Sequence, residues 1–168
     1  MTENSRAEKT RAEKFAAIET GLGYSFDGEI KIGGNYVSVV RNGKDVYVSG
    51  QIPRVGSEII ATGPVGAGDI AALTRAQLGA KVSAMRALAL LRQSLGTLDA
   101  VDRVLRIAVF VQSSADFTAQ SEVADAASDV LHAVLGPAGV HTRTSVGVMQ
   151  LPKNATVEID LIATAVAA

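Results

Sequence analysis

A short polar stretch near the carboxyl end holds the residues best suited to bind a charged small molecule. On a strand through Arg143, the side chains of His141, Arg143 and Ser145 share one face, because successive side chains of a strand point to opposite sides. A guanidinium presents a planar fork of N–H donors that matches the two oxygens of a carboxylate. The stretch therefore indicates a carboxylate clamp. The alternative is a surface Arg paired with an acidic side chain, which is the more frequent role of such a residue.

Glu158 is the second candidate, as a general base that activates water. The alternation of apolar and polar residues around it is equally typical of a solvated position on an outer face. His132 lies among apolar residues of an expected helix, which is typical of a structural histidine, and we assign it no role.

The sequence offers no pattern for a metal or a nucleotide cofactor. It has two histidines and no cysteine, and no His and carboxylate cluster at ligand spacing, so no metal site is expected. The glycine-rich segment 63–68 lacks the Lys-Ser/Thr that follows a phosphate-binding loop, and its glycines are interpreted as turns. We therefore expect no cofactor.

Composition narrows the class of protein. The chain of 168 residues is about one domain long, and its net charge of −1 argues against a nucleic-acid partner. The absence of cysteine excludes disulfides and a thiolate nucleophile. Residues 1–14 lack the apolar stretch of a signal peptide, and no run approaches the about 18 apolar residues of a membrane helix. We expect a soluble, cytoplasmic protein with no membrane partner.

The first half of the chain predicts two helices around a hairpin. A short amphipathic helix is expected over 10–21 as an appendage, ending at Gly21 or Gly23. Two strands over 36–40 and 45–49 flank an Asn-Gly turn, which is a strong hairpin signal. After a loop with a short strand at 58–61, a long helix is expected over 70–95, between an Asp69 N-cap and Gly96.

The second half predicts a strand over 101–112 at the centre of the sheet, a helix over 118–135, and strands over 142–150 and 156–165. The last two strands are expected to form a hairpin, which places Glu158 opposite Val148 and roughly 17 Å from Arg143 at ~3.3 Å per residue. The fold class is α/β (α+β): one mixed sheet with two helices packed on one face. The other face needs cover, for which a partner subunit is the simplest source.

Three blocks of the sequence together are similar to a known family. They are Val46-Tyr47-Val48-Ser49-Gly50-Gln51-Ile52-Pro53, then Val109-Phe110-Val111 before Asp116-Phe117, and Arg143 through Leu151-Pro152 to Val157-Glu158-Ile159. In order and spacing the chain resembles the Rid (YjgF) family from about Gly33 to Ala163, as a longer and divergent branch. The resemblance divides the chain into an extension with a short helix, 1–28, and a Rid-like domain, 29–168.

The resemblance implies a chorismate-mutase-like fold and a homotrimer with ligand clefts between subunits. In the archetypal members a cleft Arg binds the carboxylate of a 2-aminoacrylate-type enamine or its imine, which water hydrolyses to a 2-keto acid and ammonia without metal or cofactor. Arg143 matches that Arg. Tyr36 and Ser49 match the cleft tyrosine and serine, and Glu158 matches the glutamate that binds water.

Three cleft positions depart from the family. The cysteine two residues after the Arg is Ser145, a glutamate two further on is Gly147, and an asparagine of the second helix is Ser121. The leading hypothesis is an enamine/imine deaminase with a small-molecule carboxylate substrate, and the alternative is a non-catalytic sensor that binds a keto acid or amino-acid derivative in the same cleft. An endoribonuclease or translation inhibitor is a weaker hypothesis, because no basic cluster interleaved with aromatics is present.

Overall fold

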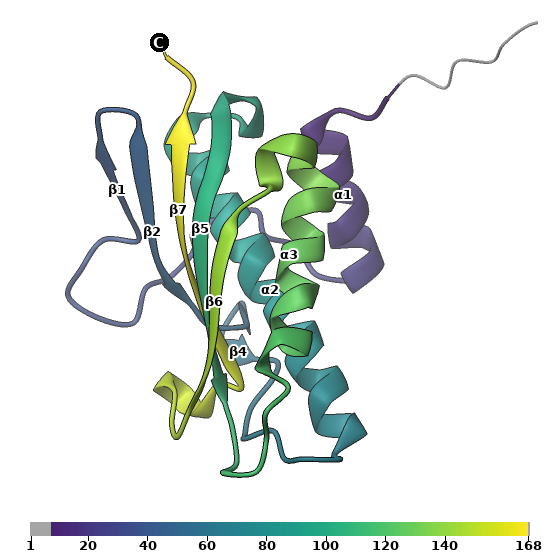
Figure 1. Cartoon of the computed structure of the whole chain (residues 1–168). Helices are drawn as coiled ribbons and strands as arrows, with labels where there is room; N and C mark the ends of the chain where they lie inside the picture. The colour runs from purple at the N-terminus through teal and green to yellow at the C-terminus, as the bar shows by residue number, and fades with distance from the viewer. Residues whose placement is uncertain (1–7, 168) are drawn as a thin grey trace, which may run out of the picture.

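The computed structural model describes residues 8–167 and forms one mixed sheet with helices on one side (Figure 1). The five strands of the sheet follow the order β1-β2-β7-β5-β6, in which β5 and β6 are parallel and the other pairs antiparallel. Their bounds are Val39–Asn42 for β1, Asp45–Gln51 for β2, Val101–Gln112 for β5, Thr142–Val148 for β6 and Val157–Ala165 for β7. A separate small pair joins β3 (Arg54–Val55) to β4 (Glu58–Ile59).

Three helices complete the fold, and their ends follow local sequence signals. They are α1 (Arg11–Leu22), α2 (Ile70–Leu95) and α3 (Gln120–Leu135). The Asp69 carboxylate accepts a hydrogen bond from the backbone of the first turn of α2, and Gly96 ends that helix in the left-handed region at φ 85°. Helices α2 and α3 lie against each other over one face of the sheet (Figure 1), which confirms the predicted fold class.

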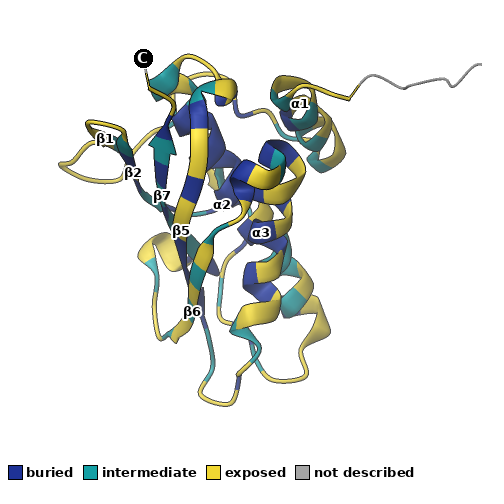
Figure 2. Cartoon of the chain, turned by 45° about the horizontal axis from the view of Figure 1, so that its top comes forward, coloured by how far each residue is buried: buried dark blue, intermediate teal, exposed yellow. Residues whose placement is uncertain are grey.

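The core lies between this helix layer and the sheet. Alternate residues of β2, β5 and β7 are buried toward the helices, as in Val157, Ile159 and Leu161 of β7. Helix α3 likewise turns its buried residues inward and its exposed ones outward (Figure 2). No helix within residues 8–167 covers the opposite face of the sheet, which we call the open face. It holds the partly exposed side chains Tyr47, Phe110, Val146, Glu158 and Asp160.

The predicted hairpin of the last two strands is wrong. Strand β6 pairs in parallel with β5 and forms an edge of the sheet, whereas β7 inserts between β2 and β5. Parallel neighbours need a crossover connection, which α3 supplies between β5 and β6. The turn Pro152–Asn154 then carries the chain past the end of β5, where Gln112 donates its backbone N–H to the carbonyl of Thr156. Strand β7, not β5, is therefore the central strand.

Helix α1 is part of the core rather than an appendage. Thr10 closes a capping box with Glu13, and Phe15 is fully buried. The Arg11 guanidinium donates to the carbonyl oxygens of Leu98 and Val101 at 2.8 and 2.7 Å. These long-range contacts tie the helix to the start of β5. The domain boundary after residue 28 stays a prediction, and residues 1–7 of that extension lie outside the described residues.

Replacing Phe15 tests how much this helix contributes. Phe15→Ala is expected to lower the free energy of unfolding by about 3–5 kcal/mol, because the change opens a cavity among packed apolar side chains. Chemical denaturation of the full chain measures it. Thr20→Ala, at an exposed position of the same helix, is the control and should change stability by about 0.5 kcal/mol or less. Equal stability of the two variants would show that α1 is dispensable.

In the part of the chain that the structure describes, no helix is both long enough and apolar enough to span a membrane.

Candidate functional site

Arg143 lies on the helix side of the sheet, at the edge that β6 forms. It pairs with Ile107 of β5 and points toward α3. Its Nη1 donates to the Asp125 carboxylate at 2.8 Å and to the Ser128 hydroxyl at 3.0 Å, and its Nη2 donates to the Ser121 carbonyl at 3.4 Å. Asp125 is therefore the acidic partner of the alternative role, in which Arg143 is a surface ion-pair residue. Because a guanidinium has five N–H donors, two remain without a partner among residues 8–167.

A chain of hydrogen bonds orients this guanidinium. His141 Nδ1 lies 2.6 Å from the carbonyl oxygen of Gly139, which selects the tautomer that carries its proton there. The other nitrogen, Nε2, lies 3.0 Å from the Ser128 hydroxyl and accepts its proton, so the hydroxyl oxygen is free to accept from Arg143. Burial lowers the pKa of His141, the hydrogen bond to Gly139 partly opposes this, and the charges of His132 and Arg143 lower it slightly further. The neutral imidazole therefore accepts a hydrogen bond from the Ser128 hydroxyl, and the Ser128 oxygen in turn accepts one from Arg143.

Of the three positions at which the sequence departs from the Rid resemblance, Ser145 and Ser121 lie near Arg143 and Gly147 lies further along β6. Ser145 lies two residues along β6 on the same face, and Ser121 contributes its carbonyl rather than its side chain. A Cβ at Gly147 would lie 2.8 Å from the side-chain nitrogen of Gln120. That amide donates to the Phe117 carbonyl at 2.8 Å. Gln120 thus occupies the space that a larger residue at 147 would need.

Glu158 lies on the open face of the sheet. It pairs with Phe110 across β7 and β5, and its half-buried carboxyl rests against Gly50, where a Cβ would overlap it. Burial raises the pKa of Glu158, and the negative charge of Asp160 raises it further. A carboxyl group with a raised pKa keeps its proton to a higher pH than an exposed glutamate does.

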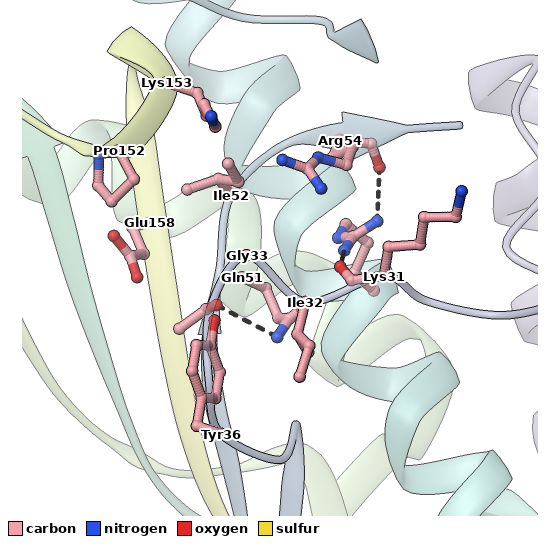
Figure 3. Close-up of a pocket in the computed structure, with 12 residues that line it drawn as sticks. Lys31, Ile32, Gly33, Tyr36, Gln51, Ile52, Arg54, Pro152, Lys153 and Glu158 are labelled. Carbon is pink, nitrogen blue, oxygen red and sulfur yellow. Dashed lines mark hydrogen bonds between the residues drawn. The ribbon is translucent and has the colours of Figure 1, made fainter. Parts of the chain in front are cut away.

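Glu158 and Tyr36 line the same cavity of about 210 Å³ (Figure 3). Ser49 is close by but belongs to a neighbouring groove of the open face, where its carbonyl and hydroxyl both accept from the Gln51 amide. The remaining lining residues come from the loop before β1, the end of β2, β3, α2 and the turn before β7, and are Lys31, Ile32, Gly33, Gly50, Gln51, Ile52, Arg54, Arg86, Pro152 and Lys153.

One chain does not bring Arg143 and Glu158 together. The expected pairing of Glu158 with Val148 is wrong, because β5 lies between β6 and β7. Arg143 is opposite Ile107, on the helix side, whereas Glu158 is opposite Phe110, on the open face. Of the predicted site residues, the structure therefore gathers Tyr36 and Glu158 in one cavity, with Arg143, Ser145 and Ser121 in a second group by α3.

The cavity also holds basic residues that the sequence did not indicate, namely Lys31, Arg54, Arg86 and Lys153. They come from four separate segments, so no motif or spacing connects them. In the described part of the chain, no group of three His, Asp or Glu side chains could hold a metal ion.

The raised pKa of Glu158 predicts a pH-dependent stability difference. The folded chain holds the Glu158 proton more tightly than the unfolded chain, so this group's contribution to stability is lost as pH rises from its ordinary pKa of 4.5 through its folded pKa. Glu158→Gln removes the ionisation. The variant is expected to gain stability over the natural chain as pH rises from about 4 to about 8, in urea unfolding. The exposed-site variant Glu58→Gln is the control. A difference that does not change with pH would contradict the burial of this carboxyl.

Comparison with known proteins gives the family. A model of the family described as endoribonuclease L-PSP matches residues 27–165. Protein TCP17 of Trypanosoma cruzi is 43% identical over 129 residues, which cover 76% of this chain and 79% of that protein.

Solved structures agree with that match. Protein Atu1372 of Agrobacterium tumefaciens, described as having unknown function, is 34% identical with a TM-score of 0.80, over 94% of this chain and 95% of that one. Escherichia coli TdcF, solved with bound serine, is 25% identical with a TM-score of 0.58, over 79% and 90% of the two chains.

The chain belongs to the endoribonuclease L-PSP family, also called the Rid or YjgF family. The resemblance carried by the Ser49–Pro53 turn, Arg143 and Glu158 is thereby confirmed at the level of the family. Membership supports a role in binding or processing a small molecule.

Proposed function

We propose that the protein is an enamine/imine deaminase, which hydrolyses reactive 2-aminoacrylate-type intermediates to 2-keto acids and ammonia. The observation that carries the proposal is the oriented guanidinium of Arg143, which keeps two N–H donors free for a carboxylate while Ser128 and Asp125 fix its position. The bound serine of TdcF, an amino acid with a carboxylate, supports a ligand of this class.

The cleft is proposed to lie between subunits of a homotrimer. Within one chain Arg143 and Glu158 face opposite sides of the sheet, so the two side chains of one chain cannot contact the same ligand. The open face exposes Val40, Tyr47 and Val146, apolar or aromatic side chains that a second subunit would cover. Arg143 of one subunit then faces Glu158, Tyr36 and Ser49 of its neighbour.

Glu158 is proposed to donate and accept the protons of the reaction. Its protonated form gives a proton to the β-carbon of the enamine, which yields the imine. Its carboxylate form then takes a proton from water as the water oxygen bonds to the imine carbon. Glu158 then returns that proton to the amino nitrogen and takes up the hydroxyl proton as the carbon–nitrogen bond breaks, which releases ammonia, leaves the 2-keto acid and restores the protonated carboxyl. Arg143 holds the carboxylate throughout, and no redox step is needed.

A sensor that binds the same carboxylate without turnover is the second candidate, favoured by the changed surroundings of Arg143. Ser145 stands where the family has a cysteine, and Gln120 fills the space beside Gly147. An endoribonuclease is a weaker proposal, since the chain has a net charge of −1 and its sequence contains no run of basic residues interleaved with aromatics that would hold a nucleic-acid strand.

An assay on enamines made in situ separates the two leading functions. An amino-acid oxidase converts an amino acid to its imine, and we expect the protein to accelerate the release of keto acid and ammonia above the rate with oxidase alone. Titration with the keto acid product measures binding in parallel. Binding without any acceleration would replace the deaminase with the sensor.

A further inference from the structure

The cavity beside Glu158 contains more positive charge than its acidic residue balances. Lys31, Arg54, Arg86 and Lys153 all line it, and all four also line an adjoining cavity between β3 and the segment before β1. Glu158 is the one acidic residue in the lining of the first cavity. The second cavity adds Asp27, which is paired with Arg92 at 2.7 Å, and the exposed Glu29.

Arg86 is the residue at the base of this group. It projects from α2, is 7% exposed, and its Nη1 and Nη2 donate to the carbonyl oxygens of Arg54 and Lys31 at 2.9 and 3.4 Å. Its Nε is buried without a partner, as is the Nε of Arg54. Burial, and the like charge of Arg54, lower the pKa of Arg86 to about 10. Two guanidinium groups are thus held close together at the cavity wall.

No acidic side chain compensates these charges within residues 8–167. The ion pairs found there involve Lys14, Arg92 and Arg143, and none involves Arg54, Arg86 or Lys153. Glu158 makes no ion pair with any of them in the described part of the chain. Arg86 is the buried member of the group, an uncompensated buried cation is costly, and a bound anion reduces that cost.

We propose that Arg54 and Lys153, with the buried Arg86 behind them, form a subsite for the phosphoryl group of a small phosphorylated molecule. Figure 3 shows the Lys153 and Arg54 side chains directed into the cavity, with Glu158 and Tyr36 at its other walls. Lys153 reaches it from a turn at positive φ, 59°. The Arg54 guanidinium and the Lys153 ammonium, with the charge of Arg86 behind them, match a tetrahedral dianion better than a single carboxylate, which one Arg satisfies.

The subsite adjoins the proposed deaminase cleft, because Glu158 and Tyr36 line the same cavity, but anion binding by its cations does not require turnover. The cavity volume of about 210 Å³ suits a small ligand, and Ile32, Ile52 and Tyr36 offer apolar surface beside the cations. Arg143, the proposed carboxylate clamp, belongs to the other face of the sheet. Binding of phosphate to the cavity and turnover of enamines are therefore separate measurements.

Calorimetric titration of the full chain with inorganic phosphate at constant ionic strength tests the subsite. We expect saturable binding that Arg54→Gln and Lys153→Gln each weaken on the order of tenfold to a hundredfold. Lys81→Gln removes one positive charge at an exposed position of α2 and should bind as the natural chain does. Arg143→Lys should also leave phosphate binding unchanged, although it impairs the deaminase.

Three results would overturn the proposal. They are an absence of saturable phosphate binding, an equal loss in Lys81→Gln, and a loss confined to Arg143→Lys, which would place the anion at the other group. Malonate at the same ionic strength is the comparison ligand, and malonate binding as tight as phosphate would overturn the phosphoryl assignment. Arg86 is left intact in these variants, because its links to β3 and the segment before β1 also support the fold.

Discussion

Arg143→Lys is expected to lower kcat/KM for short 2-imino acids by roughly tenfold to a hundredfold, nearly as far as Arg143→Ala, because a lost hydrogen bond to a charged group costs about 1.5–3 kcal/mol. The lysine ammonium keeps the positive charge but does not offer the planar pair of donors that fits a carboxylate. In the structure the guanidinium donates to Asp125 and Ser128, and two of its N–H donors have no partner among residues 8–167. The single ammonium of lysine cannot keep these contacts and also offer a carboxylate a planar pair of donors.

The matched control removes the ion pair and keeps the Arg. The Asp125 side chain is 64% exposed, so Asp125→Asn should change stability by about 1 kcal/mol or less. Sedimentation of each variant should show the same assembly as the natural chain. Full turnover by Arg143→Lys would reduce Arg143 to the surface ion-pair residue that its contact with Asp125 also fits. Dissociation or unfolding of that variant would make its role structural.

Glu158→Gln is expected to lower kcat by about 10²–10⁴-fold, because glutamine keeps the shape of the side chain but can neither take up nor release the proton. Binding of the keto acid product should change little. The structure places the carboxyl against Gly50, at a position where a Cβ on residue 50 would overlap it. An unchanged kcat in steady-state assays would exclude Glu158 from the proton transfers.

Asp160→Asn distinguishes proton transfer from a purely structural effect. Asp160 lies two residues along β7 on the same face, and its negative charge is one cause of the raised pKa of Glu158. Its removal should shift the part of the kcat pH profile that reports the ionisation of Glu158 toward lower pH while the maximal rate is retained. A pH profile that does not move would separate Asp160 from the reaction.

The elements of the fold were predictable from local signals, but their order in the sheet was not. Asp69 and Gly96 bound α2 as predicted, and the Asn42-Gly43 turn joins β1 to β2. The short connection between β6 and β7 suggested a hairpin, yet β7 pairs with β2 and β5. Alternation of apolar residues shows which residues of a strand are buried, but it does not indicate which other strand pairs with it.

The candidate site was likewise predictable only in part. Residue types and family resemblance selected Tyr36 and Glu158, which do share a cavity. They did not indicate that Arg143 lies on the opposite face, since the two faces follow from strand order. The cations around Arg86 gave no signal at all, because they lie far apart along the chain and only the folded structure brings them into one lining.

Arg143 of one subunit and Glu158 of the next are proposed to form a single cleft, and mixing two inactive variants tests this arrangement most directly. Arg143→Ala and Glu158→Gln are refolded together in equal amounts, with sedimentation to establish that mixed trimers form. A cleft between subunits predicts recovery to about one quarter of the natural activity, because about a quarter of the clefts receive an intact residue from each side. Mixed trimers that remain as inactive as the separate variants would contradict the shared cleft.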